Sequence, residues 1–142
     1  GGDAFGEDAL IGGTTRNSTV TMVTDGVLLR IAKEDFCTLL REPLLERVSR
    51  SEADARARSG AVWLDVRFPA EYAFDKIFGA INIPLNEIRN AANSLDPSRQ
   101  YIVYCQSGKR SSAAAFLLSQ RGYRACVLEG GLRSGLLAGS RA

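Results

Sequence analysis

The sequence contains no histidine among its 142 residues. Imidazole is the usual proton carrier near neutral pH and a common metal ligand, so its absence excludes Cys-His pairs, Ser-His pairs and His-bearing zinc sites. Any chemistry of this chain must therefore use other side chains.

Cysteine is also scarce, with only Cys37, Cys105 and Cys126. Three scattered cysteines form neither a disulfide framework nor a Cys-x-x-Cys metal motif, so we expect no metal, no cofactor and a reducing, cytoplasmic environment. No apolar run approaches the roughly 20 residues of a membrane helix, and no secretory leader is recognisable. We therefore expect no membrane partner.

Charge is unevenly distributed along a composition typical of globular proteins, with 45% apolar and 24% charged residues. Residues 1–45 carry a net charge of −3, and residues 46–142 carry +5. The second part therefore favours small anions. Its basic residues are dispersed without a Lys/Arg run, so we expect no nucleic acid partner.

Residues 19–32 contain two runs of residues that favour β-strands, joined by Asp25 and Gly26. An Asp-Gly pair between two such runs predicts an antiparallel hairpin with a type I′ turn. Helical spacing follows over residues 33–40, and Pro43 can begin another helix from residue 44 to about residue 58. The second half of that helix is almost wholly polar, which predicts a solvent-exposed connection.

A glycine opens a short helix before this hairpin, and its free N–H groups suit a phosphate. Arg16 can add a bidentate contact and Glu7 can accept a ribose hydroxyl, although an ordinary turn with a surface arginine is the alternative. A motif of three parts spans this region. It comprises Phe5-Gly6-Glu7, Ala9-Leu10 and Arg16-Asn17-Ser18-Thr19-Val20. The motif resembles the phosphate-binding cassette of cyclic nucleotide-binding domains.

This resemblance implies that Glu7 holds the ribose 2′-hydroxyl and that Arg16 holds the cyclic phosphate. Gly6, Ser18 and Thr19 would line the anion site, with Ser18 in place of the usual alanine. The family's β-roll needs further strands before the cassette, whereas Glu7 stands near the beginning of this sequence. We therefore expect this chain to bind cyclic AMP or cyclic GMP weakly or not at all, whatever a longer parent protein does.

From residue 59 onward, short apolar runs alternate with helical stretches. The expected strands are 61–64, 81–83, 101–104 and 125–128, and the expected helices are 69–74, 85–92, 111–120 and 132–137. The alternation predicts an α/β domain with a central parallel sheet and helices on both faces. Active residues of such domains gather beyond the carboxyl ends of the strands.

Cys105 stands at such an end, and residues 106–110 lead from it into a helix. Gly108 lets this loop curl, so that backbone N–H groups can point inward as an anion site. The helix dipole and the charges of Lys109 and Arg110 favour a thiolate without any histidine. The alternative is a buried structural cysteine, which is what we expect for the other two, set among apolar neighbours.

A longer series of motifs covers most of residues 59–142. It comprises Trp63-Leu-Asp65-Val-Arg67, Glu71-Tyr72, Gly79-Ala-Ile-Asn-Ile-Pro84, Tyr104-Cys105 with Gly108, Arg110 and Ser111, and Gly130-Gly131. The series resembles a single-domain rhodanese, a sulfurtransferase with an α/β fold. The resemblance implies that Cys105 takes sulfane sulfur from a small anionic donor such as thiosulfate. The resulting persulfide then passes the sulfur to a thiol or cyanide.

The resemblance also implies roles around the nucleophile. The substrate-binding loop would consist of Gln106, Ser107, Gly108, Lys109, Arg110 and Ser111. Asp65 and Arg67 would lie near it, and a purely structural role at the strand ends is equally expected for them. The chain departs from the family in having Asp75-Lys76 where Gly-His is usual, and Leu132-Arg133 where an aromatic residue usually follows Gly-Gly.

Two other functions stay open. Cysteine phosphatases of a related fold have their arginine six positions after the cysteine, whereas Arg110 lies five positions after Cys105, and the shorter loop favours sulfur over phosphate. A catalytically silent interaction or sensory module is the second alternative, and the retained Cys105 weakens it.

The two resemblances together divide the chain. Residues 1–45 would be a fragment of a cyclic nucleotide-binding domain with part of its β-roll, residues 46–58 a connecting helix, and residues 59–142 a rhodanese-like domain. Control of sulfur transfer by a cyclic nucleotide is a hypothesis that rests on the adjacency of these parts.

Overall fold

The computed structural model describes residues 5–12, 15–16, 18–41 and 45–134. The chain divides into two compact units, Gly1–Leu44 and Leu45–Ala142. Within the described ranges, none of the helices has the length and hydropathy needed to span a bilayer. Pro43 and the end of the helix predicted over residues 132–137 lie outside these ranges. The described part of that helix is helical and begins one residue earlier than predicted, at residue 131.

The first unit contains helices but not the predicted hairpin. Its helices are α1 (Glu7–Gly12), α2 (Lys33–Asp35) and the π-helix η1 (Phe36–Arg41), so the helix predicted over 33–40 is confirmed. The hairpin over 19–32, the β-roll part of the predicted fold, is wrong: the structure assigns no strand to residues 18–32, and all their side chains are exposed. A two-stranded hairpin is only marginally stable in water unless one of its faces is covered.

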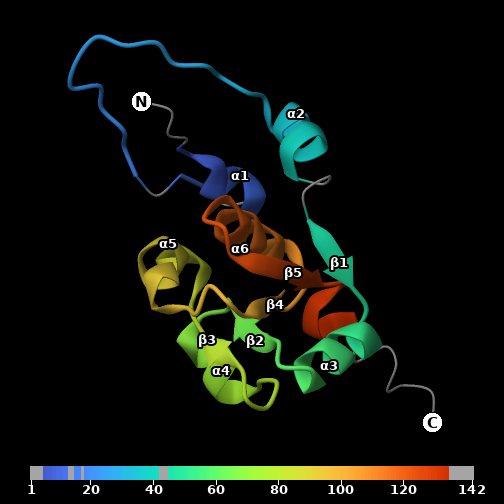
Figure 1. The fold of residues 1–142 in the computed structure, drawn as a ribbon. Coiled ribbons are helices and arrows are strands. Elements are labelled where there is room, and N and C mark those ends of the chain that lie inside the picture. Colours follow the sequence, from blue (N-terminus) through green and yellow to red (C-terminus); the bar gives the residue numbers. More distant parts are fainter. Residues whose placement is uncertain (1–4, 13–14, 17, 42–44, 135–142) are drawn as a thin grey trace. The chain divides into compact units, whose positions relative to one another are not determined.

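The second unit is built around a five-stranded sheet (Figure 1). Its strands are β1 (Glu46–Val48), β2 (Val62–Asp65), β3 (Ile81–Asn82), β4 (Gln100–Tyr104) and β5 (Arg124–Leu128). Their order is β1-β5-β4-β2-β3, and every pair is parallel. The predicted parallel α/β sheet is confirmed, together with four of its strands.

The remaining strand, β1, is a finding of the structure. The sequence predicts a helix from residue 44, whereas Glu46, Arg47 and Val48 pair with β5. Only Val48 is buried in this three-residue strand, so its apolar pattern is too short to be recognised. The helix α3 (Arg50–Arg58) follows, and the hydroxyl of Ser49 caps it by accepting the N–H of Glu52 at 3.3 Å. Both elements belong to the second unit.

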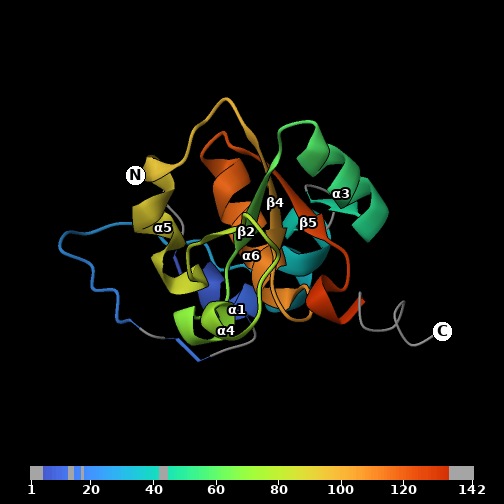
Figure 2. The ribbon, with the colours of Figure 1, turned by 90° about the horizontal axis from the view of Figure 1, so that it is seen from below.

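The other helices agree with the prediction. They are α4 (Pro69–Phe74), the short series η3 (Leu85–Glu87), α5 (Ile88–Ala91) and η4 (Ala92–Ser94), and α6 (Lys109–Gln120). Figure 2 shows α3 and α6 on opposite sides of the central strands. Helices therefore cover both faces of the sheet, as parallel sheets require.

Side chains of β4 alternate between these two faces. Ile102 and Tyr104 belong to a buried cluster with Ala53 of α3 and Trp63 of β2, and the Tyr104 and Trp63 rings meet edge to face at 5.8 Å. Burying each such side chain stabilises the fold by about 1.5–3 kcal/mol. The end of β4, where Cys105 follows, is thereby held in place.

Candidate functional site

Cys105 directly follows β4, and its sulfur faces the beginning of α6. The Sγ atom accepts the N–H of Gly108 at 3.1 Å and the N–H of Ser111 at 3.4 Å, and it lies 3.4 Å from the Ser111 hydroxyl. Two backbone N–H donors and one hydroxyl at the beginning of α6 therefore lie against this sulfur. The residue has no exposed surface, so this sulfur lies beneath the loop.

Gly108 gives the loop its turn. Its φ of +93° lies in the left-handed region, which favours glycine, and this conformation directs its N–H to the sulfur. The hydroxyl of Ser112 donates to the carbonyl oxygen of Gly108 at 2.7 Å, and Arg47 of β1 donates to that hydroxyl at 3.4 Å. Hydrogen bonds from the first turn of α6 therefore stabilise the loop conformation at Gly108.

The backbone of Gly131 packs closely against the backbone of the loop that follows Cys105. A Cβ atom at this position would overlap the carbonyl oxygen of Cys105 and lie 2.8 Å from the carbonyl carbon of Gln106. The N–H of Leu132 donates to the Cys105 carbonyl at 3.0 Å, and that of Arg133 donates to the Gln106 carbonyl at 3.2 Å. The Gly-Gly motif is visible in the sequence, but this close backbone approach is not.

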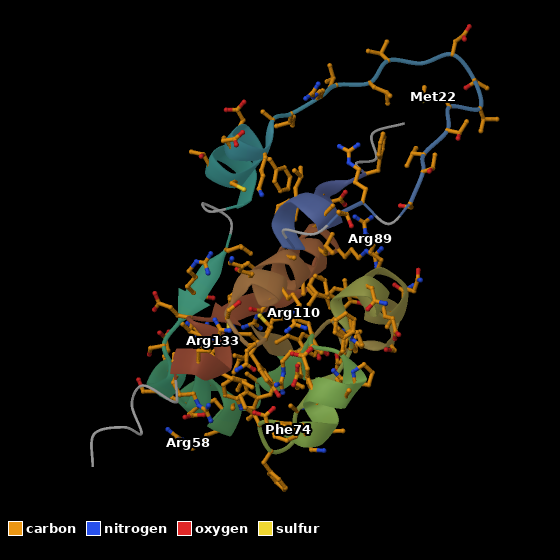
Figure 3. The ribbon with its side chains drawn as sticks, turned by 180° about the vertical axis from the view of Figure 1, so that it is seen from behind. Met22, Arg58, Phe74, Arg89, Arg110 and Arg133 are labelled. Atoms are coloured by element: carbon orange, nitrogen blue, oxygen red, sulfur yellow. The ribbon has the colours of Figure 1, made fainter. Side chains whose placement is uncertain are left out.

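Arg110, labelled in Figure 3, forms a bidentate ion pair with Glu71, which lies 39 residues earlier in the chain. Its two terminal nitrogens donate to the two carboxylate oxygens at 2.7 and 2.8 Å, and its guanidinium lies 5.8 Å from the ring centre of Phe68. The bond from Arg110 lowers the pKa of Glu71 to about 2. Glu71 therefore compensates the charge of Arg110, a pairing that no local sequence pattern indicates.

Asp65 and Arg67 form a buried pair beside the loop. Both side chains are almost fully buried, and the terminal nitrogen of Arg67 donates to Asp65 at 2.8 Å. Another nitrogen of Arg67 donates to Asp75 at 2.8 Å and reaches the Gln106 side chain at 3.5 Å. The contacts of Arg67 therefore include Asp75, a departure from the family pattern, and the loop residue Gln106.

The remaining loop residues differ in exposure. Ser107 and Lys109 are exposed, whereas Gln106 is half-buried. The Lys109 side chain therefore reaches the solvent at the start of α6. Among the residues that the structure describes, no group of three or more Cys, Asp or Glu side chains is arranged to hold a metal ion.

The residues of the nucleotide-binding resemblance lie in the first unit. Gly6 has a φ of +84°, and a Cβ there would lie 3.9 Å from Nε of Arg16, so the arginine lies beside the glycine. Glu7 is buried, whereas Ser18 and Thr19 are exposed. The structure thus brings two members of the motif together and leaves Ser18 and Thr19 on the exposed extended segment.

Comparison with known proteins places the second unit. Residues 49–136 match the family model of the rhodanese-like domain. Thiosulfate sulfurtransferase PspE of Escherichia coli is 38% identical over 73 residues, which are 50% of this chain and 70% of that protein. Thiosulfate sulfurtransferase GlpE of Pseudomonas fluorescens is 33% identical over 87 residues, 61% of this chain and 80% of that protein.

Solved structures agree with this match. The crystal structure of a rhodanese-related protein from Thermoplasma volcanium superposes with a TM-score of 0.62 at 34% identity, over 66% of this chain and 93% of that one. The matched region contains the strand, loop and helix that enclose the sulfur of Cys105. Sequence, fold and comparison therefore agree that this chain belongs to the rhodanese-like domain family.

Proposed function

We propose that the second unit is a sulfurtransferase in which Cys105 carries the transferred sulfur. The observation that carries this proposal is the convergence of the Gly108 and Ser111 N–H groups on Sγ at the amino end of α6. The names of the two relatives, both thiosulfate sulfurtransferases, support the same reaction class.

The reaction takes two steps. The Cys105 thiolate attacks the outer sulfur of thiosulfate, an S–S bond forms, and the S–S bond of thiosulfate breaks so that sulfite leaves with the electron pair. A thiolate or cyanide then attacks the outer sulfur of the persulfide, the persulfide S–S bond breaks, and Cys105 leaves as the thiolate while the acceptor becomes a new persulfide or thiocyanate. Neither step needs a proton carrier, which agrees with the absence of histidine.

The residues of the loop have different roles in this reaction. The N–H groups of Gly108 and Ser111 stabilise the negative sulfur, and exposed Lys109 attracts the anionic donor. Arg110 acts as a positioning residue for the loop, because its guanidinium is paired with the Glu71 carboxylate. Since Cys105 is buried, the loop must shift slightly for the donor to reach the sulfur.

The two alternatives fare differently. A phosphatase needs its loop arginine to bind phosphate, and the engagement of Arg110 by Glu71 disfavours that use. A catalytically silent interaction module agrees with the complete burial of Cys105, and sulfur transfer from thiosulfate is the observation that would exclude it.

Mass spectrometry after incubation with thiosulfate tests the proposal. We expect a mass gain of one sulfur, about 32 Da, that maps to Cys105 and is removed by cyanide or dithiothreitol. No gain would favour the silent module. Turnover of an aryl phosphate with inhibition by vanadate would favour the phosphatase.

We also propose that, in a longer parent protein of the cytoplasm, residues 5–20 take part in binding a cyclic nucleotide. The proximity of Arg16 to Gly6 supports this, because a guanidinium beside the start of α1 suits an anionic phosphate. Calorimetry with cyclic AMP on this chain should show weak binding or none. Thiosulfate turnover by the parent protein that does not change with cyclic nucleotide would contradict the regulatory link.

A further inference from the structure

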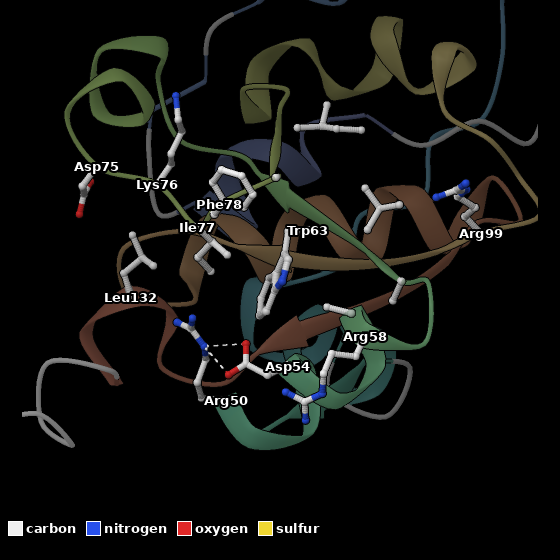
Figure 4. A pocket seen from close by; sticks show the side chains of 15 residues that line it. Arg50, Asp54, Arg58, Trp63, Asp75, Lys76, Ile77, Phe78, Arg99 and Leu132 are labelled. Carbon is white, nitrogen blue, oxygen red and sulfur yellow. Dashed lines mark hydrogen bonds and ion pairs between the residues drawn. The ribbon is translucent and has the colours of Figure 1, made fainter.

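An open groove of about 920 Å³ lies on the side of the second unit that α3 covers (Figure 4). Cys105 is not among the residues that line it, so this groove is separate from the buried sulfur. Figure 4 shows the Trp63 ring in its centre, between Phe78 and the ion pair of Arg50 with Asp54. Ile77, Ile81 and Leu132 add further apolar surface.

Positive charge predominates along the groove. Four basic side chains line it, Arg50, Arg58, Lys76 and Arg99, against two acidic ones, Asp54 and Asp75. Both acidic groups are engaged by arginines, Asp54 by Arg50 at 3.1 Å and Asp75 by Arg67 at 2.8 Å. Arg99 in turn pairs with Asp96 at 3.7 Å, so Arg58 and Lys76 contribute most of the remaining positive charge. This charge attracts an anionic occupant and repels a cationic one.

The groove also exposes an aromatic side chain to water. Phe78 is 98% exposed, and Ile81, which also lines the groove, is 43% exposed. A phenylalanine can bury about 150–250 Å² of surface on contact, so an occupant with an apolar side chain gains free energy here. Charge and apolar surface together select an acidic segment that carries an apolar residue.

Two lining residues connect the groove with the Cys105 loop. The N–H of Leu132 donates to the carbonyl oxygen of Cys105 at 3.0 Å. Asp75 binds Arg67, and Arg67 in turn reaches the side chain of Gln106. A polypeptide seated in the groove would therefore lie beside the loop that holds the sulfur.

We propose that this groove binds a segment of a partner protein, the one that exchanges sulfur with Cys105. This segment contains acidic residues and an apolar side chain. The identity of the partner as a sulfur donor or acceptor rests on the proposed function, whereas the preference for an acidic segment rests on the groove alone. The groove would hold the partner while its reactive group approaches the loop.

Trp63 is the only tryptophan of the chain, so its fluorescence reports on the groove directly. The probe is a short synthetic peptide of aspartate and glutamate around one central leucine. We expect a saturable change in Trp63 emission that weakens with added salt, because charge attraction between surfaces is screened. A peptide with alanine in place of leucine should bind about tenfold more weakly, and one with lysine in place of the acids should not bind.

Matched variants locate the interaction. Arg58→Glu, which reverses a lining charge, should weaken peptide binding about tenfold. Arg124→Glu makes the same charge change on an exposed arginine that does not line this groove and should leave the affinity within about twofold. Phe78→Ala should weaken binding of the leucine peptide more than that of the alanine peptide. The Trp63 emission of each free variant should equal that of the unmodified chain, which shows that the groove is intact.

Equal responses to the acidic and lysine peptides, or equal losses from Arg58→Glu and Arg124→Glu, would overturn the proposal. So would tighter binding of a single-stranded oligonucleotide than of the acidic peptide. Persulfide formation on the unmodified chain is measured separately. Persulfide without a peptide response overturns the docking groove alone, and a peptide response without persulfide overturns only the partner's role in sulfur transfer.

Discussion

Cys105 follows β4 and Cys126 lies within the neighbouring strand β5, and neither has any exposed surface. Cys126 lies within β5, opposite Ile102 of β4, and its Sγ donates to the carbonyl oxygen of Tyr101 at 3.7 Å. Burial raises the pKa of its thiol to about 11. The Cys105 sulfur instead accepts two backbone N–H groups. The two sulfurs are therefore equally buried, but that of Cys126 faces a carbonyl oxygen and that of Cys105 faces N–H donors.

The difference follows from where each cysteine stands on the backbone. Inside a strand, N–H groups are used by the sheet, so a buried thiol meets mainly apolar side chains and carbonyl oxygens. At the end of a strand that turns into a helix, the first N–H groups of the helix have no partner within it and can point to a sulfur. The position, and not the burial, separates a structural cysteine from a candidate nucleophile.

The largest expected effect separates the two cysteines by substitution. Cys105→Ser should reduce thiosulfate:cyanide sulfur transfer about a thousand-fold or more, because a hydroxyl cannot form the persulfide. Cys126→Ser should keep the rate within about twofold, since Ser can still donate to the Tyr101 carbonyl, at a cost of about 1–2 kcal/mol in stability. Turnover assays check both. A comparable loss of activity in both variants would contradict the comparison.

Gly131→Ala should disturb the Cys105 loop through its backbone contact. The added Cβ overlaps the Cys105 carbonyl oxygen, and a loop shift of about 1 Å costs up to about a hundred-fold in turnover. Gly122→Ala is the matched control, since Gly122 also has a positive φ but nothing lies within 4 Å of the added Cβ. We expect both variants to lose about 1 kcal/mol or more in urea unfolding, and only Gly131→Ala to lose most of its turnover.

Glu71→Gln should loosen Arg110 and reduce turnover about tenfold. It should also flatten the acid dependence of stability. Arg110 lowers the pKa of Glu71 from its usual value of 4.5 to about 2. The pair therefore stabilises the fold fully at pH values above 4.5, and this contribution is lost as the pH falls toward about 2. The pair is partly exposed, so we expect only about 1 kcal/mol. Equal losses in the variant and the unmodified chain, measured by urea unfolding across this range, would exclude the ion pair as the cause.

The smallest expected effect concerns Cys126 at alkaline pH. Its neutral thiol is favoured in the folded state, so its contribution to stability is complete below the ordinary pKa near 9 and is lost as pH rises through about 11. Cys126→Ser has no such titration, so its deficit in unfolding free energy should narrow over this range. A constant deficit would contradict the assigned surroundings of the thiol.

Local sequence patterns predict much of the second unit. The strand, loop and helix around Cys105 are recognisable because a buried strand, a glycine turn and a helix start follow each other within residues 100–120. Similar β-forming residues at 19–32 form no strand, and their side chains stay exposed. Strand propensity expresses itself only where another surface covers one face.

The absence of histidine, the alternation of strands and helices, and the place of Cys105 between a strand and a helix are all evident in the amino-acid sequence. Three features become visible only in the folded domain: Glu71 compensates Arg110, β1 completes the sheet, and Gly131 packs against the Cys105 loop. These contacts join residues far apart in the chain. Whether they form depends on packing of the whole domain, which no local pattern encodes.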